Sequence, residues 1–423
     1  MQRRFKPVDW SYNGSIYEVN IRQYTPEGTF NAFAAHLPRL RDMGIEILWF
    51  MPITPISKEG RLGKLGSYYA CSDYTAINPE YGTLKDFTAL VKQAHKLGFK
   101  VIIDWVANHT GLDHTWTKSN PSFYKKNAQG SFYDSNGWED VIDLNYYDYG
   151  MRTAMIDAMK FWVTTCDIDG FRCDMAHLVP LDFWSQARMQ LDPVKPLFWL
   201  AETDQPSYLS VFDSWYAWRW MSVMEMYYKE QKFMHGLVEV LDMYAKDFPA
   251  DAFPLFFTTN HDENSWNGTE FEKYGNAARV FAVFCCTWFG LPLVYSGQEI
   301  PNTKRLKFFE KDTIEWKGDP SLHSFYKTLL QLRKTNPALQ PREDARPKLV
   351  ATNLNEFVLT FKRTSGKREV IVLLNLSAQP RAVFLPQGSV EGTYTNVFFG
   401  NKIQINSSSP IDLDSWGYLV LTN

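Results

Sequence analysis

Residues 151–202 read MRTAMIDAMKFWVTTCDIDGFRCDMAHLVPLDFWSQARMQLDPVKPLFWLAE, and this stretch contains one pattern twice. In each copy an amphipathic helix is followed by a short apolar strand. The spacing of the apolar residues predicts helices over 151–166 and 181–191 and strands over 168–174 and 197–202. Each strand ends in an acidic residue, Asp174 or Glu202. Strands that alternate with helices are typical of a parallel sheet, so the stretch indicates an α/β fold.

The same alternation continues on both sides of this stretch. Further helices are predicted over 29–43 and 84–97. Apolar runs predict eight strands in all, over 15–21, 45–51, 99–104, 168–174, 197–202, 211–215, 251–259 and 291–295. Eight strands separated by helices favour a closed (β/α)8 TIM barrel over an open sheet.

Two segments depart from this alternation. Residues 110–143 are polar and aromatic and rich in Asn, Asp, Gly and Ser, which predicts a short insertion after the third strand. Beyond Pro341 the pattern changes to alternating strands, predicted over 356–363, 369–376, 382–385, 392–396 and 417–421. The predicted division is a barrel over 1–109 and 144–341, an inserted domain over 110–143, and a C-terminal antiparallel β-sandwich over 342–423.

The composition excludes several partners. The 423 residues carry a formal net charge of -3 with both signs mixed along the chain, which argues against nucleic acid and against an anionic membrane. No apolar run approaches the roughly 20 residues of a membrane span. Residues 1–10 lack the apolar core of a signal peptide, and compartment and oligomeric state stay open. Aromatic residues make up 16% of the chain, and their flat, amphipathic rings suit a neutral, sugar-like partner as well as a large core.

Polar residues follow four of the predicted strands. They are Asp104 in DWVANH, Arg172 with Asp174 in GFRCD, Glu202 in WLAE, and Asp262 in TTNHD. The carboxyl ends of barrel strands carry the active site, and the period of two along a strand puts Arg172 and Asp174 on one face. A single acid in such a place is often a helix cap, but several on separate strands favour a convergent site.

The residues alone leave the chemistry of this site open. Three carboxylates with nearby histidines suit either metal-assisted hydrolysis or the paired-acid chemistry of glycoside hydrolases. The sequence has no HExxH motif and no histidine cluster with ligand spacing, which favours the paired acids. Spacing does not assign a role to any one acid.

At these residues the chain resembles the alpha-amylase family of retaining glycoside hydrolases. The four family motifs are similar to 104–109, 170–174, Glu202 and 260–262, in that order. The resemblance implies that Asp174 is the nucleophile, Glu202 the general acid/base and Asp262 the transition-state stabiliser. Arg172 would orient Asp174 and keep it ionised, and Asp104 would support Arg172.

The resemblance also implies residues that contact the substrate. His109 and His261 resemble the family's donors to the sugar at the cleavage point, and Tyr69 resembles the tyrosine that stacks under it. His177 stands where ordinary starch amylases carry the lysine of a Lys-His pair, which puts their leaving-side contacts in doubt. Asn108 and Asp143 match positions that bind calcium in many members, where oxygen ligands tie the barrel to the insertion.

The expected function is therefore retaining hydrolysis of alpha-glucosidic bonds, with alpha-1,4 bonds favoured, in starch-like glucans or maltooligosaccharides. Alternatives on the same scaffold are a 4-alpha-glucanotransferase and a cyclomaltodextrinase-like enzyme. A non-catalytic glucan-binding protein is disfavoured, because all three motif acids are present. Chain-length preference and the choice between endo and exo action do not follow from the sequence.

Overall fold

Eight parallel strands close into a barrel in this computed structural model, which describes residues 5–230, 234–316 and 321–423. Each strand pairs with its sequence neighbour, and the last pairs with the first. The strands are β1 (Ile16–Val19), β2 (Ile47–Phe50), β3 (Lys100–Trp105), β6 (Gly170–Cys173), β7 (Phe198–Ala201), β8 (Ser214–Tyr216), β9 (Phe253–Phe256) and β10 (Leu291–Tyr295). The predicted TIM barrel is confirmed.

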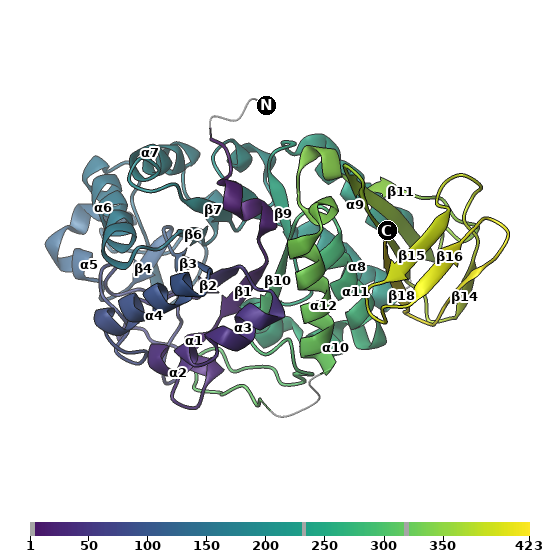
Figure 1. Cartoon of the computed structure of the whole chain (residues 1–423). Coiled ribbons are helices and arrows are strands. Elements are labelled where there is room, and N and C mark those ends of the chain that lie inside the picture. The colour runs from purple at the N-terminus through teal and green to yellow at the C-terminus, as the bar shows by residue number, and fades with distance from the viewer. Residues whose placement is uncertain (1–4, 231–233, 317–320) are drawn as a thin grey trace.

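Helices surround the barrel and cover the outer faces of its strands (Figure 1). They are α1 (Ile21–Tyr24), α2 (Phe30–Ala34), α3 (Leu37–Met43), α4 (Leu84–Lys96), α6 (Tyr149–Cys166), α7 (Leu181–Leu191), α8 (Trp218–Glu230), α9 (Met234–Asp247), α10 (Glu270–Tyr274), α11 (Ala278–Thr287) and α12 (Ser321–Thr335). Between β7 and β8 the chain forms the 3-10 helix η4 (Pro206–Ser210). No helix within the described ranges is both long and apolar enough to span a membrane.

Four predicted barrel elements had the wrong bounds. The helix predicted over 29–43 is split into α2 and α3, because Pro38 lies in the first turn of α3 and a helix cannot run through a proline ring. The strand predicted over 15–21 ends at Val19 and runs directly into α1. The strands predicted over 211–215 and 251–259 are shorter in the structure, where β8 runs one residue past its predicted end and β9 lies within its predicted range.

The segment between β3 and α6 contains a small antiparallel pair. Strand β4 (His109–Gly111) pairs with β5 (Val141–Asp143), so that His109 lies opposite Asp143. The helix α5 (Thr115–Ser119) and the 3-10 helix η2 (Pro121–Phe123) lie between the two strands. The pair holds the polar segment beside the carboxyl end of β3.

The C-terminal part is an antiparallel β structure beside α8, α11 and α12 (Figure 1), as predicted. Its six-stranded sheet has the order β11-β12-β13-β18-β15-β16, and β14 pairs with β17. The strands are β11 (Lys348–Leu349), β12 (Val358–Ser365), β13 (Arg368–Asn375), β14 (Arg381–Val383), β15 (Gly392–Asn396), β16 (Lys402–Ile405), β17 (Ile411–Leu413) and β18 (Tyr418–Thr422). Strands β11, β16 and β17 were not predicted, because they are short and their side chains are mostly exposed or half-buried.

Strand β13 connects the two hydrophobic cores. Val370, Val372 and Leu374 belong to the core shared with the barrel, whereas Ile371 and Leu373 belong to the core of the C-terminal domain. This division follows the period of two of a strand that is buried on both faces. The buried Arg363 on β12 adds polar contacts, because its guanidinium donates to the carbonyls of Thr287 and Trp288 at 3.1 and 2.9 Å.

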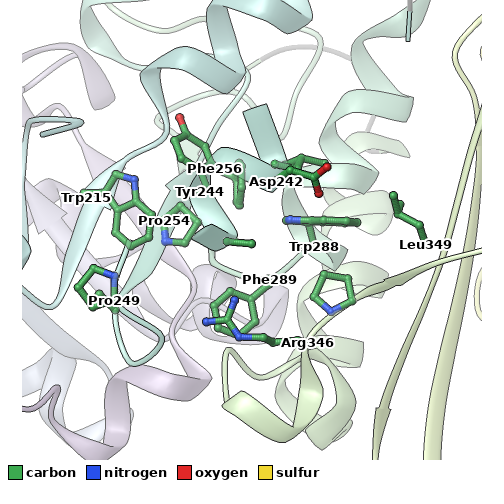
Figure 2. A pocket seen from close by; sticks show the side chains of 14 residues that line it. Trp215, Asp242, Tyr244, Pro249, Pro254, Phe256, Trp288, Phe289, Arg346 and Leu349 are labelled. Atoms are coloured by element: carbon green, nitrogen blue, oxygen red, sulfur yellow. The ribbon is translucent and has the colours of Figure 1, made fainter. Parts of the chain in front are cut away.

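A cavity of about 130 Å³ lies near this junction. Figure 2 shows its aromatic lining, which includes Trp215, Tyr244, Trp288 and Phe289, with Arg346 stacked on Phe289 at 4.4 Å. Residues that precede β9 and β10 contribute to the lining. The cavity is thus at the amino-terminal end of these strands, away from the acids that follow the strands.

Candidate active site

A single guanidinium joins three carboxyl groups at the carboxyl ends of β3, β6 and β7. Arg172 is fully buried. Its Nη1 lies 2.8 Å from Asp104 Oδ1 and 2.8 Å from Asp174 Oδ1. Its Nη2 lies 2.8 Å from Glu202 Oε2. The two acids of GFRCD and WLAE, 28 positions apart in the chain, therefore face the same cation.

Strand register explains why these side chains meet. Asp104 is paired directly with Arg172 across β3 and β6. The ladder continues beyond the strands, because the Asp174 amide donates to the Trp105 carbonyl at 3.1 Å and the Glu202 amide donates to the Cys173 carbonyl at 3.0 Å. Parallel strands in this register bring their carboxyl ends to one level, so acids at those ends converge.

A second set of contacts, made by residues on or just after β1 and β9, involves Asp262. The His261 ring lies between Glu18 and Asp262, with Nδ1 2.5 Å from Glu18 Oε1 and Nε2 3.3 Å from Asp262 Oδ2. The hydroxyl of Tyr69 lies 2.7 Å from His261 Nε2 and donates to Asp104 Oδ2 at 3.1 Å. All five of these acids are therefore connected through Arg172, His261 or Tyr69.

Burial and charge set the protonation states at this site. Burial raises the pKa of Glu202 to about 7, with the charges of Asp174 and Asp262 adding to the rise and Arg172 opposing it. Burial raises the pKa of Asp174 to about 6, although the Arg172 guanidinium acts to lower it. Burial opposes the charge on His261, but the carboxylates of Asp262 and Glu18 raise its pKa well above the ordinary value. Near neutral pH, Asp174 is thus more ionised than Glu202, and His261 is a cation.

The acids open onto a cavity of about 260 Å³ with aromatic walls. Tyr69 stacks on His261 at 5.4 Å and is nearly parallel to Phe308 at 6.3 Å. Trp266 lies 5.4 Å from Phe308 and is 52% exposed. On the side of the inserted segment, Trp138 lies edge to face with His109 at 5.2 Å. A flat, hydroxyl-bearing ring fits between such surfaces, since aromatic faces cover its C–H groups while carboxylates accept from its hydroxyls.

The predicted substrate contacts take three kinds of position. Tyr69 and His109 line the cavity together with the three acids. Burial lowers the pKa of His109 to about 4, so its ring is neutral. Arg172 and His261 are not among the lining residues and lie behind the carboxylates they hold. His177 is also absent from the lining, in the 3-10 helix η3 (Ala176–Leu178), where its carbonyl accepts from Tyr208 at 3.1 Å.

Comparisons with known proteins agree with this arrangement. The family model described as alpha amylase, catalytic domain, matches residues 3–139 and 122–219, which together exceed half of the chain. The maltogenic alpha-amylase AmyB from Thermotoga neapolitana superposes with a TM-score of 0.90 at 30% identity, covering 98% of this chain and 99% of AmyB. This chain belongs to the alpha-amylase family.

Other relatives of this alpha-amylase family member span a range of lengths. The alpha-amylase of Lactobacillus plantarum superposes with a TM-score of 0.88 at 29% identity, covering 98% of this chain and 99% of that protein. Alpha-amylase MalA from Haloarcula japonica is 26% identical over 419 residues, covering 93% of this chain. The chain spans 59% of the length of MalA, and 35% of the length of a Burkholderia pseudomallei maltosyltransferase that is 26% identical.

Asp143, one of the two residues that the resemblance implies as calcium ligands, is paired with a lysine in this alpha-amylase family member. Lys125 Nζ lies 2.8 Å from Asp143 Oδ2, which also accepts from the Ser135 hydroxyl at 2.5 Å. Burial opposes ionisation of Asp143, but these donors hold its pKa below the ordinary value. The Asn108 amide nitrogen lies 3.1 Å from His109 Nδ1.

These residues do not fit a calcium ion. Asp143 Oδ1 is buried without a hydrogen-bond partner, which by itself would favour a cation. An ammonium group already neutralises the same carboxylate, and calcium takes six to eight oxygen ligands. Within the described ranges no group of three or more His, Cys, Asp or Glu side chains is placed to hold a metal ion.

Several residues of the site were missed by the sequence analysis. Glu18 is an acid inside the apolar strand β1, and this break in the apolar run was the available signal. Trp138 lies in the predicted insertion and Trp266 four positions after Asp262, so both were adjacent to recognised segments. Phe308 lies on the long connection between β10 and α12, where no sequence pattern points to the cavity.

Proposed function

We propose that this protein hydrolyses alpha-glucosidic bonds, with alpha-1,4 bonds favoured, in starch-like glucans or maltooligosaccharides, with retention of configuration. The observation that carries the proposal is that Arg172 holds Asp174 and Glu202 by distances of 2.8 Å each at the edge of one cavity. Retaining glycoside hydrolases need two carboxyl groups about 5 to 5.5 Å apart, one to attack and one to protonate. Contact with one guanidinium keeps the Asp174 and Glu202 carboxyl groups close to each other, which supports this mechanism.

In the first step Asp174 attacks the anomeric carbon, and Glu202 gives its proton to the leaving glycosidic oxygen. The product is a glycosyl ester on Asp174 and a released sugar. Forming the ester removes the charge of Asp174, which is one of the causes that raise the pKa of Glu202. Glu202 then favours its ionised form, takes a proton from water, and the resulting hydroxide equivalent displaces Asp174.

The other residues hold the sugar during these steps. The Asp262 side chain is 39% exposed, and the His261 cation keeps it ionised against the effect of burial. Its carboxylate accepts hydrogen bonds from the hydroxyl groups of the bound sugar ring. The Tyr69 ring, backed by Phe308, forms the apolar floor, and the neutral His109 donates or accepts at the opposite wall. Relatives named as alpha-amylases, a maltogenic alpha-amylase and a cyclomaltodextrin glucanotransferase support an alpha-glucan as the substrate class.

The test is a time course of products from starch, pullulan, cyclodextrin and maltoheptaose, with the anomer of the first product read by proton NMR. We expect an alpha-configured first product and a loss of several orders of magnitude in kcat for Asp174→Asn, with sugar binding retained. A beta-configured first product, or wild-type turnover in that variant, would exclude the assignment. The Glu239→Gln variant, at an exposed position on α9, is the control, and it should keep the activity of the wild type.

Transfer to a sugar acceptor is the second candidate. Maltosyltransferases and a cyclomaltodextrin glucanotransferase are among the relatives. The half-buried Met175 side chain lines the cavity beside Glu202, where an acceptor must approach to meet the acid/base, and it presents an apolar surface there. Products longer than the starting maltoheptaose indicate transfer, and products that are all shorter indicate hydrolysis.

A further inference from the structure

Met175, the residue after the proposed nucleophile, has a left-handed backbone. Its φ is 41° and its ψ is 44°. Among the described non-glycine residues, Asp167 and Trp416 share a positive φ, and neither follows an acid of the site. This conformation crowds the Cβ atom of every residue but glycine, so a methionine here is held against a local cost.

The left-handed turn directs one main-chain amide away from the sheet. The amide before it, at Asp174, donates to the Trp105 carbonyl at 3.1 Å, and the amide after it, at Ala176, donates to the Glu202 carbonyl at 3.2 Å. Both bonds belong to the extended ladder of the barrel. The Met175 amide between them donates to the side chain instead, at 2.8 Å from Glu202 Oε2.

Glu202 depends on this donor because its other partner is shared. Oε2 faces Arg172 Nη2 at 2.8 Å, and that guanidinium also serves Asp104 and Asp174. The Met175 amide is neutral and is committed to Glu202 alone. No hydrogen bond to Oε1 is formed within the part of the chain that the structure describes. Oε2 accepts the Met175 amide and lies beside the Arg172 cation, and both contacts favour negative charge on Oε2, so the proton of the carboxyl group is favoured on Oε1.

We propose that the main-chain amide of Met175, aimed by its left-handed backbone, is a positioning group that orients Glu202 and assigns its transferable proton to Oε1. The catalytic role of this proton rests on the proposed function, whereas the hydrogen bond from the Met175 amide to Glu202 does not depend on it. The local cost at Met175 is consistent with such a role, since strained backbone persists where surrounding structure holds it in place.

Two isomeric side chains test this proposal. Leucine and isoleucine contain the same atoms, but the branch at Cβ makes a left-handed backbone far less tolerable for isoleucine. Met175→Leu therefore shows any loss of activity that comes only from changing the side chain in the cavity. Met175→Ile carries that loss and, in addition, turns the amide away from Glu202.

The first readout is the pH profile of kcat/KM. Relative to Met175→Leu, we expect Met175→Ile to lower kcat/KM by about tenfold or more, because a misaligned acid protonates the leaving oxygen poorly. We also expect its alkaline limb to move up by about half a pH unit or more, because the lost amide stabilised the carboxylate. A loss of packing that admitted water would move that limb down instead, because burial is the main cause of the raised pKa of Glu202.

The second readout needs no turnover. In protein labelled with ¹³C-glutamate, the carboxyl signal of Glu202 is assigned by its disappearance in Glu202→Gln and then titrated in both isomeric variants. A higher Glu202 pKa in the isoleucine variant than in the leucine variant is the expected result. Equal titration curves and equal kcat/KM in the two variants would overturn the proposal.

Two further outcomes are informative. If Met175→Ile does not fold, Met175→Gly takes its place, because glycine adopts the left-handed backbone freely and keeps the amide in position. Its Glu202 titration should then match that of Met175→Leu, and a higher pKa in the glycine variant would overturn the proposal. If the wild type hydrolyses no alpha-glucan, the proposed function fails while the titration still decides the role of the amide.

Discussion

The burial of Glu202 predicts that the proposed acid/base destabilises the fold as the pH rises. Its pKa changes from an ordinary value of 4.5 to about 7 in the folded protein. A carboxyl whose folded pKa is raised binds its proton more tightly in the folded state. Its contribution to stability is therefore present below pH 4.5 and is lost as the pH rises through 7. Glu202→Gln removes this dependence, because glutamine is neutral at every pH.

The magnitude follows from the same two values. One pKa unit corresponds to about 1.4 kcal/mol, so the ionised Glu202 costs about 3 kcal/mol of unfolding free energy at pH 8 relative to pH 4.5. Glu202 is 6% exposed, so solvent screening reduces this figure little. Part of the effect will be offset, because removing the Glu202 charge also changes the titration of Asp174.

The measurement is equilibrium urea unfolding of the wild type and Glu202→Gln at pH 4.5 and pH 8, followed by tryptophan fluorescence. We expect the variant to be inactive and to gain up to about 3 kcal/mol over the wild type at pH 8, with little gain at pH 4.5. A stability difference that is the same at both pH values would refute the reasoning.

Glu272→Gln is the matched control, with the opposite sign. Hydrogen bonds from Arg305 and from the Thr269 main-chain amide lower the pKa of Glu272, and its side chain is about half exposed. A carboxyl with a lowered pKa contributes stability above its ordinary value and loses it as the pH falls. This variant should therefore be less stable than the wild type at pH 8 and closer to it at low pH.

Three other predictions concern the calcium positions, the cavity wall and the domain junction. EDTA should leave the melting temperature of the wild type unchanged, and Lys125→Met should lower the unfolding free energy by about 1 to 3 kcal/mol, because it leaves Asp143 buried without its cation. Calcium-dependent melting of the wild type would contradict this. Trp266→Ala should raise KM for maltoheptaose more than it lowers kcat, since its exposed ring covers the substrate; an unchanged KM would exclude that contact. Arg363→Met should cost about 2 to 4 kcal/mol in urea unfolding, because the carbonyls of Thr287 and Trp288 lose their donor; a change under 0.5 kcal/mol would argue against the junction contact.

Much of the fold could be predicted because the barrel is built from local patterns. The apolar strand before Asp174 and the helix over 151–166 each follow a period that neighbouring residues determine. Predicted boundaries were wrong where a single residue overrides the periodic pattern, as Pro38 does between α2 and α3. Strands failed where the pattern is absent, as in the largely exposed β16.

The sequence by itself determined that four acids and an arginine would come together, because strands in a parallel barrel present their carboxyl ends on one side. Only the tertiary structure decided which atoms meet. Asp104, Asp174 and Glu202 share one guanidinium, Lys125 occupies the carboxylate of Asp143, and Phe308 backs Tyr69. These contacts join residues from different elements at fixed distances, so they depend on strand register and loop path, which no local period encodes.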